Sequence, residues 1–338
     1  MSHINTISEF LLHAGTECHV FDMARGIISV NSQDFLEIES AQKPAPRPRQ
    51  QHAWFGIIFF NKLASSEHYI WFIKLPLDEK GLVIEAGRQQ FLHIVVEALG
   101  ETLNNEKNPN NQLPENPFTF IPGQQQLADF NSLCKTRLGL PFSEHLESTV
   151  KYIQHSQNED WRNISLQGIA DFCASLETLH FENLLLTSFE NLAPQIQTAL
   201  CASLENHQLN SKLSQLLIDW GLQEPKNLET TLSVIRALSQ SQARSQVKDY
   251  IFSVLKCHLG RDNTILMLIA ARHWKQLADA EVLKLYIENL AQNDATSFVG
   301  LFSDLVQIPE TRPSMLAVLR WTNKSPSLTQ AIGKVFGQ

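Results

Sequence analysis

The chain has 338 residues, of which 43% are apolar and 18% are charged, as in a soluble globular protein long enough for two or three domains. Its net charge of −8 argues against general binding to nucleic acids or anionic membranes, because both need a basic surface. The five cysteines are odd in number and scattered, which favours reduced thiols over a disulfide framework.

The first residues and the apolar runs predict a cytoplasmic protein. The segment MSHINTISEFLLHAG has no basic region and only a short apolar stretch, so it does not predict a signal peptide. The longest apolar runs, residues 53–60 and 265–271, are much shorter than the roughly 20 residues that a membrane-spanning helix needs. We therefore expect neither secretion nor membrane insertion.

Residues 1–102 predict an α+β domain with a small antiparallel sheet of about four strands and helices on one face. Hairpin-like connections dominate, and no strand–helix–strand crossover is required. In chain order we expect a helix ending at Gly15, two strands around a turn at 24–26, a helix capped by Asn31 or Ser32, strands at 53–60 and 68–75, and a helix over about 86–99.

The run KPAPRPRQ, residues 43–50, interrupts this pattern. Its alternating prolines lack the donors that a helix or a central strand needs. The run could bind to a groove in another protein that recognises polyproline helices. It could also be a loop that covers a sheet edge and prevents association with other sheets, and we favour this alternative.

The composition changes over residues 103–126, which are rich in Asn, Gln and Pro. Such a stretch buries too little apolar area to offset the entropy of ordering it, so we interpret it as a linker. Only its PFTFI segment is apolar, and this segment could dock on a neighbouring domain.

Residues 127–338 predict an all-α domain. Apolar residues recur at helical spacing; Leu213, Leu217 and Trp220, for example, share one face. Helix starts near Ser211, Ala243, Asp279 and Thr311 are 32 to 36 residues apart, the interval of a stack of helical hairpins. The sequence therefore predicts a HEAT-like array of helical hairpins, with a non-repeating helical bundle as the alternative.

No motif of metal, nucleotide or nucleophile chemistry occurs in the sequence. The adjacent pairs Cys18–His19 and Cys257–His258 lack the spacing that directs two ligands at one ion. Glycine-rich phosphate loops and the G-x-S-x-G turn are absent, and no cysteine has a reactive context. We expect no metal and no cofactor.

Five charged residues of the N-terminal domain are candidates for a ligand site at the domain junction. Asp78 and Glu79 follow the expected strand at 68–75, but the order Pro, Asp, Glu, Lys, Gly is also typical of a turn, which we favour. Asp22 and Arg25 could pair with each other or contact a ligand. Arg88, in the following helix, completes the set.

Aromatic and basic residues are candidates for interaction surfaces. Trp54 and Trp71 lie in the two apolar strands. A modest basic strip contains Arg236, Arg244 and Lys248. Trp274 beside Arg272 has a composition that is typical of interfaces, although a tryptophan in such a pattern is more often part of the core.

Three motifs of the N-terminal half, VFDMARGI, AWFGIIFF and IWFIKLPLDEKGLVIEAGRQQFL, resemble in this order a proteobacterial family of proteins of unknown function, DUF3549. The resemblance extends along the whole chain and is most specific between Phe21 and Leu92. It implies a cytoplasmic bacterial protein and supplies no activity, substrate, cofactor or catalytic residue.

The function that we expect is a non-enzymatic adaptor or scaffold that binds a protein partner, because a stack of helical hairpins presents an extended surface. The small sheet domain is also a candidate for self-association. One alternative is an enzyme or small-ligand binder that uses the charged residues of the N-terminal domain. Another is a nucleic-acid binder that uses the basic strip.

Overall fold

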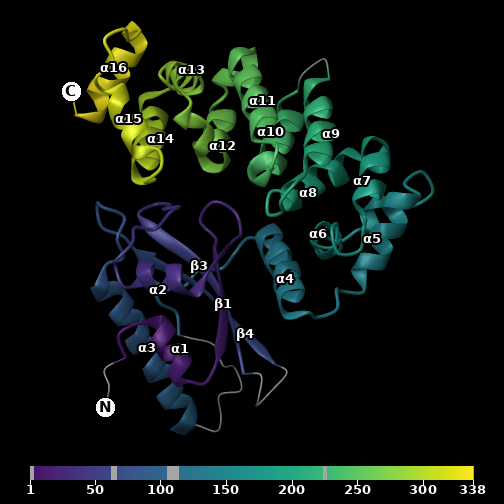
Figure 1. Ribbon diagram of the computed structural model, residues 1–338, viewed down its shortest axis with the longest axis vertical. Coiled ribbons are helices and arrows are strands. Elements are labelled where there is room, and N and C mark those ends of the chain that lie inside the picture. Colours follow the sequence, from purple (N-terminus) through teal and green to yellow (C-terminus); the bar gives the residue numbers. More distant parts are fainter. Residues whose placement is uncertain (1–3, 62–66, 105–113, 224–226, 338) are drawn as a thin grey trace. The chain divides into compact units, whose positions relative to one another are not determined.

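The computed structural model describes residues 4–61, 67–104, 114–223 and 227–337 (Figure 1). The chain divides into two compact units. The first, the sheet unit, comprises Met1–Pro122 and Val306–Arg312, and the second, the helical unit, comprises Gly123–Leu305 and Pro313–Gln338. Within the described residues, no helix is both long enough and apolar enough to cross a membrane.

The sheet unit contains the expected four-stranded antiparallel sheet, with the strand order β2-β1-β3-β4. Its strands are β1 (Glu17–Asp22), β2 (Ile28–Val30), β3 (His52–Phe60) and β4 (His68–Pro76). The aromatic and β-branched side chains of β3 and β4 suit a half-buried pleated surface. Register pairs such as Phe55–Ile73 and Ile57–Trp71 place alternate side chains of both strands on the same face.

Three helices pack against that face, as the sequence predicts: α1 (Ile7–His13), α2 (Ser32–Glu39) and α3 (Glu85–Asn104). Ile7, Phe35 and Phe91 from these helices join Phe55 and Ile73 from the strands in one buried core. The helices begin where side chains cap them. Thr6 forms a capping box with Glu9 at α1, and Asn31 accepts the Asp34 N–H at α2.

The apolar part of the expected linker is docked on the sheet unit. Phe118 and Phe120 run antiparallel to β4, with Lys74 N–H donating to Phe118 O at 2.8 Å and Phe120 N–H donating to Phe72 O at 3.1 Å. Phe118 is 7% exposed and joins the core. This pairing covers part of the edge of β4. Residues 105–113 of the expected linker lie outside the described residues.

The helical unit is an array of helical hairpins. Its helices are α4 (Gln124–Leu138), α5 (His145–Gln154), α6 (Leu166–Ala174), α7 (Glu182–Ser188), α8 (Pro194–Leu204), α9 (Ser211–Leu222), α10 (Leu228–Ala237), α11 (Arg244–Lys256), α12 (Asn263–Arg272), α13 (Ala280–Leu290), α14 (Ala295–Gln307), α15 (Arg312–Val318) and α16 (Pro326–Val335). Short 3₁₀ turns lie at Trp161–Asn163, Phe189–Asn191, Leu238–Gln240, His258–Arg261 and Trp274–Ala278.

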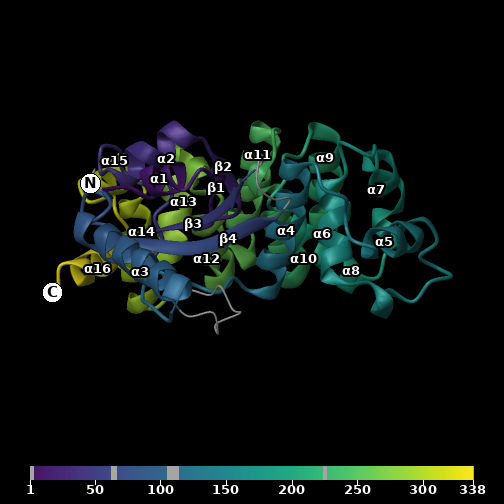
Figure 2. The ribbon, with the colours of Figure 1, turned by 90° about the horizontal axis from the view of Figure 1, so that it is seen from below.

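The helices form two rows. One row stacks α4, α6, α8, α10 and α12 in succession, and the other stacks α5, α7, α9, α11 and α13 (Figure 1). Figure 2 shows these helices from below. Even-numbered and odd-numbered helices contact each other, for example α9 with α10 and α12 with α13. Each hairpin therefore buries its apolar faces against its neighbours.

The repeat interval agrees with the sequence. Helices α9, α11, α13 and α15 begin at Ser211, Arg244, Ala280 and Arg312, so the predicted starts and their spacing of 32 to 36 residues are confirmed. Polar contacts also join successive helices of one row: Gln246 of α11 bonds to Gln215 of α9, and Lys248 of α11 bonds to Asp279 at the start of α13. Asp279 also caps α13, as Asp262 caps α12 and Ser325 caps α16.

Candidate functional site

Asp22, at the end of β1, is buried in the sheet unit and contacts groups of the same unit. Its Oδ2 lies 3.1 Å from Arg47 Nε, and its Oδ1 accepts the Ala24 N–H at 3.0 Å. Burial raises the pKa of Asp22, and the charge of Arg47 opposes the shift. The charge of Arg25 acts on the same carboxylate, so the structure brings Asp22 and Arg25 together and adds Arg47 to them.

The buried Arg25 holds the proline run against the sheet unit. Its Nε and Nη2 donate to Pro48 O at 3.1 and 2.8 Å. Ala45, in the same run, is buried and donates its N–H to Gly81 O at 2.9 Å. These contacts make residues 43–50 a packed loop.

The stretch that contains Asp78 and Glu79 is a turn. Asp78 Oδ1 accepts the N–H groups of Lys80 and Leu82, both at 2.8 Å, and the Asp78 N–H donates to Leu82 O at 2.8 Å. Gly81 has a φ of 81°, a conformation that glycine adopts without strain. Asp78 therefore closes the turn between β4 and α3, and Glu79 is exposed on it.

Arg88 is buried at a different place, between α3 and the end of α2. Its Nη1 donates to Glu39 O, and its Nη2 lies 3.4 Å from Glu85 Oε1. The Glu39 carboxylate in turn accepts the N–H groups of Ile7 and Ser8 at 2.7 and 3.0 Å. Arg88 thus supports the start of α1. The five candidate residues accordingly form no single site: Asp22 and Arg25 lie together, Asp78 and Glu79 lie in the turn, and Arg88 belongs to a third set of contacts.

The two strand tryptophans lie on opposite faces of the sheet. The ring of Trp71 is 5.8 Å from that of Phe91, on the face that the helices cover. Trp54 lies on the other face, where its ring is 4.8 Å from Phe120 and 5.6 Å from Lys74 Nζ. Its Nε1 donates to Arg49 O at 3.0 Å. Trp54 thus packs against the docked segment.

The basic candidates of the helical unit do not form one strip. Arg236 and Arg272 both donate through Nε to Oε2 of Glu205 at 3.0 Å, and Lys248 pairs with Asp279 at 3.2 Å. Arg244 is exposed at the start of α11.

Trp274 is a core residue. It is 5% exposed, so its assignment to an interaction surface is wrong. The reason is the 3₁₀ turn after α12, which directs the indole into the core of the array.

Glu205 belongs to a buried polar network that spans four helices of one row. Burial tends to raise its pKa, but the charge of Arg272 and the bonds from Arg236 outweigh this and hold the pKa below its usual range. Nearby, Asp129 of α4 accepts bonds from Ser203 at 2.6 Å and Asn206 at 3.0 Å. Burial, to which the charge of Glu205 adds, raises the pKa of Asp129 to about 6.

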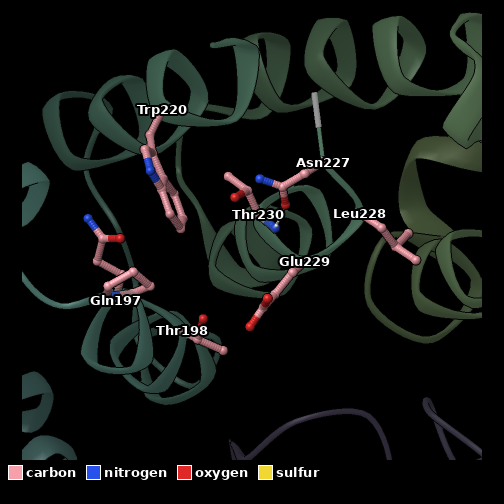
Figure 3. A pocket seen from close by; sticks show the side chains of 8 residues that line it. Gln197, Thr198, Trp220, Asn227, Leu228, Glu229 and Thr230 are labelled. Carbon is pink, nitrogen blue, oxygen red and sulfur yellow. Dashed lines mark hydrogen bonds between the residues drawn. The ribbon is translucent and has the colours of Figure 1, made fainter. Parts of the chain in front are cut away.

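A pocket of about 390 Å³ lies between α8, α9 and α10 (Figure 3). The first turn of α8 forms one wall, the end of α9 a second wall and the first turn of α10 a third. Figure 3 shows the indole of Trp220 and the carboxylate of Glu229 directed into the pocket. The lining residues are Pro194, Gln197, Thr198, Trp220, Asn227, Leu228, Glu229 and Thr230.

Several polar groups of this pocket are not used by the fold. Asn227 caps α10 by accepting the Thr230 N–H at 2.7 Å, and Gln197 donates to Phe189 O at 2.8 Å. In contrast, Trp220 Nε1, the Glu229 carboxylate and the Thr198 hydroxyl make no hydrogen bond within the described part of the chain. These groups are partly or fully exposed, so they are available to an external partner.

Comparison with known proteins assigns a family. The family whose description is "Protein of unknown function (DUF3549)" matches residues 2–336. The chain belongs to DUF3549. No curated protein and no solved structure matches it.

The DUF3549 match covers both units, so the sheet, the hairpin array and the pocket belong to one family domain. The described residues contain no group of three or more His, Cys, Asp or Glu side chains that could hold a metal ion. In the pocket between α8, α9 and α10, several polar groups that the fold does not use lie together.

Sequence reasoning missed this pocket. The helical spacing placed Trp220 on the same face as Leu213 and Leu217, which are buried, but Trp220 itself is half-buried. The local signals were present: Pro194 is typical of the first residue of a helix, and Asn227 is typical of a cap. These signals predict two helix starts, but they do not show that the two starts lie side by side.

Proposed function

We propose that this DUF3549 protein is a non-enzymatic adaptor of the bacterial cytoplasm that binds a segment of a partner protein on its hairpin array, which acts as an α-solenoid. The observation that carries the proposal is the pocket between α8, α9 and α10, where the indole N–H, a carboxylate and a hydroxyl make no hydrogen bond within the described part of the chain. Stacked hairpins present such surfaces between consecutive repeats, which suits them to extended partners.

The two alternatives have less support. The charged residues on which a ligand site would depend are engaged in structural contacts, such as Asp22 with Arg47 and Asp78 within its turn. A nucleic-acid surface would need unpaired cations, whereas Arg236 and Lys248 are each neutralised by a carboxylate.

Site-specific photo-crosslinking in the organism of origin tests the proposal. A photoreactive residue is placed at Thr198, which is half-buried in the pocket wall, and in a control at Ser148, which is exposed on α5. We expect one protein to crosslink from position 198 and not from position 148. Equal crosslinking from both positions, or none from either, would contradict a partner site at the pocket.

A further inference from the structure

The charge of the pocket indicates what it accepts. Among the eight described residues that line it, Glu229 has the only ionisable side chain. None of these eight described residues is a lysine, arginine or histidine. A carboxylate without a cationic partner attracts a positive group and repels a negative one. The net charge of −8 adds a general preference for cationic partners.

Helix geometry explains part of the placement of Glu229. It lies in the first turn of α10, where a negative side chain complements the partial positive charge of the helix N-terminus. The helix N-terminus offsets part of the negative charge of Glu229 and so weakens its attraction for a cation. A test of binding therefore has to separate recognition of a cation by Glu229 from its stabilisation of α10. Glu281 provides the comparison. It occupies the same position in α13, two residues after the capping Asp279, and it is exposed outside the pocket.

Trp220, in the wall of the pocket, adds a preference for a flat cation. Trp220 is held by an edge-on contact with Phe189, with ring centroids 5.1 Å apart and an interplanar angle of 85°. Its ring is directed into the pocket (Figure 3). Cations bind to the faces of tryptophan rings, and a flat guanidinium also stacks on them. The hydroxyl of Thr198 and the carboxylate of Glu229 can accept hydrogen bonds from the same group.

We propose that the pocket between α8, α9 and α10 binds the side chain of an arginine from the partner. The guanidinium stacks on Trp220 and donates to Glu229 and Thr198. Arginine fits better than lysine because its planar group donates in several directions while it stacks, whereas an ammonium is a compact and strongly hydrated charge. The partner as the source of this arginine rests on the proposed function, but the chemistry of the pocket does not.

Titration of the full-length protein with N-acetyl-arginine methylamide tests the inference. The probe is followed through the indole N–H resonances in nuclear magnetic resonance spectra, with the Trp220 signal assigned from the Trp220→Phe variant. We expect the Trp220 signal to shift with a Kd of about 1–10 mM, as for a small ligand that makes few contacts. The citrulline analogue has the same shape without the charge, and we expect it to bind at least threefold more weakly.

Two matched variants separate charge recognition from helix stabilisation. We expect Glu229→Gln to weaken binding of the arginine probe at least threefold and Glu281→Gln to leave it unchanged. Equal binding of arginine and citrulline, an equal effect of the two variants, or a response at other tryptophans only would overturn the inference.

The results also separate this inference from the proposed function. Arginine binding that depends on Glu229, together with no crosslinked partner, would support the pocket chemistry and contradict the adaptor. A partner crosslinked from position 198, together with no binding of the arginine probe, would support the adaptor and contradict the arginine site.

Discussion

Gly87 of α3 lies directly against Pro76 at the end of β4. A Cβ atom at residue 87 would be 2.6 Å from Pro76 Cγ and 3.4 Å from the ring of Phe118. The helix can approach the strand this closely only because residue 87 has no side chain. This contact fixes the place where the chain turns from the sheet into α3, and it links the docked segment to the same point.

Replacement of Gly87 by alanine should therefore destabilise the sheet unit. We expect a loss of about 1–3 kcal/mol, because a methyl group at this position forces the helix or the proline to move. The matched control is Gly300→Ala in α14, where a Cβ meets nothing within 4 Å. That change should stabilise the protein by about 0.5–1 kcal/mol through helix propensity. Urea denaturation measures both, and equal effects of the two changes would argue against the close approach.

The docked segment should contribute to the stability of the sheet unit through Phe118. We expect Phe118→Ala to cost about 3–5 kcal/mol, because it removes a buried ring from the core. Ile121 in the same segment is 93% exposed, so Ile121→Ala should change stability by less than about 0.5 kcal/mol. Denaturant unfolding of the two variants is the measurement. A small effect of Phe118→Ala would show that the segment is not docked in solution.

Asp129 should make the helical unit less stable as the pH rises from about 4 to 6. Its pKa is raised from 3.8 to about 6, so only well below pH 3.8 is the carboxyl protonated in both the folded and the unfolded state. As the pH rises, the unfolded chain releases the proton first, and the free energy of unfolding falls by roughly 3 kcal/mol at most.

The comparison of wild type with Asp129→Asn isolates this contribution. Glu205 has the opposite sign, because its lowered pKa adds stability above its unfolded value near 4.5 that is lost as the pH falls. We expect the difference in unfolding free energy between the two proteins to change between pH 4 and pH 6. A constant difference over this range would refute the raised pKa.

The two arginines on Glu205 should act as a unit. We expect Arg236→Met and Arg272→Met together to cost about 3–5 kcal/mol, because they leave a buried carboxylate without a cation. A third change, Glu205→Met, should restore part of the loss by removing that charge. Denaturation of the double and triple variants tests this, and a further loss in the triple variant would contradict the charge argument.

Most of the architecture can be predicted from the amino-acid sequence. The aromatic and β-branched runs of β3 and β4 specify a half-buried sheet, and residues such as Asp262 and Ser325 specify where helices begin. The repeat of 32 to 36 residues is visible because each hairpin buries the same faces. These features depend on contacts between residues that are close in the chain, or on a periodic pattern, and both can be recognised in one sequence.

Which side chains are available to a partner depends on the tertiary fold. Arg236 and Arg272 appear as surface cations in the sequence, yet a carboxylate 31 and 67 residues away binds them both. Trp220 belongs to an apolar face, yet it lines a pocket because the starts of α8 and α10 lie side by side. Charge pairing and pocket formation depend on contacts between distant segments, and these contacts are set by how the hairpins stack.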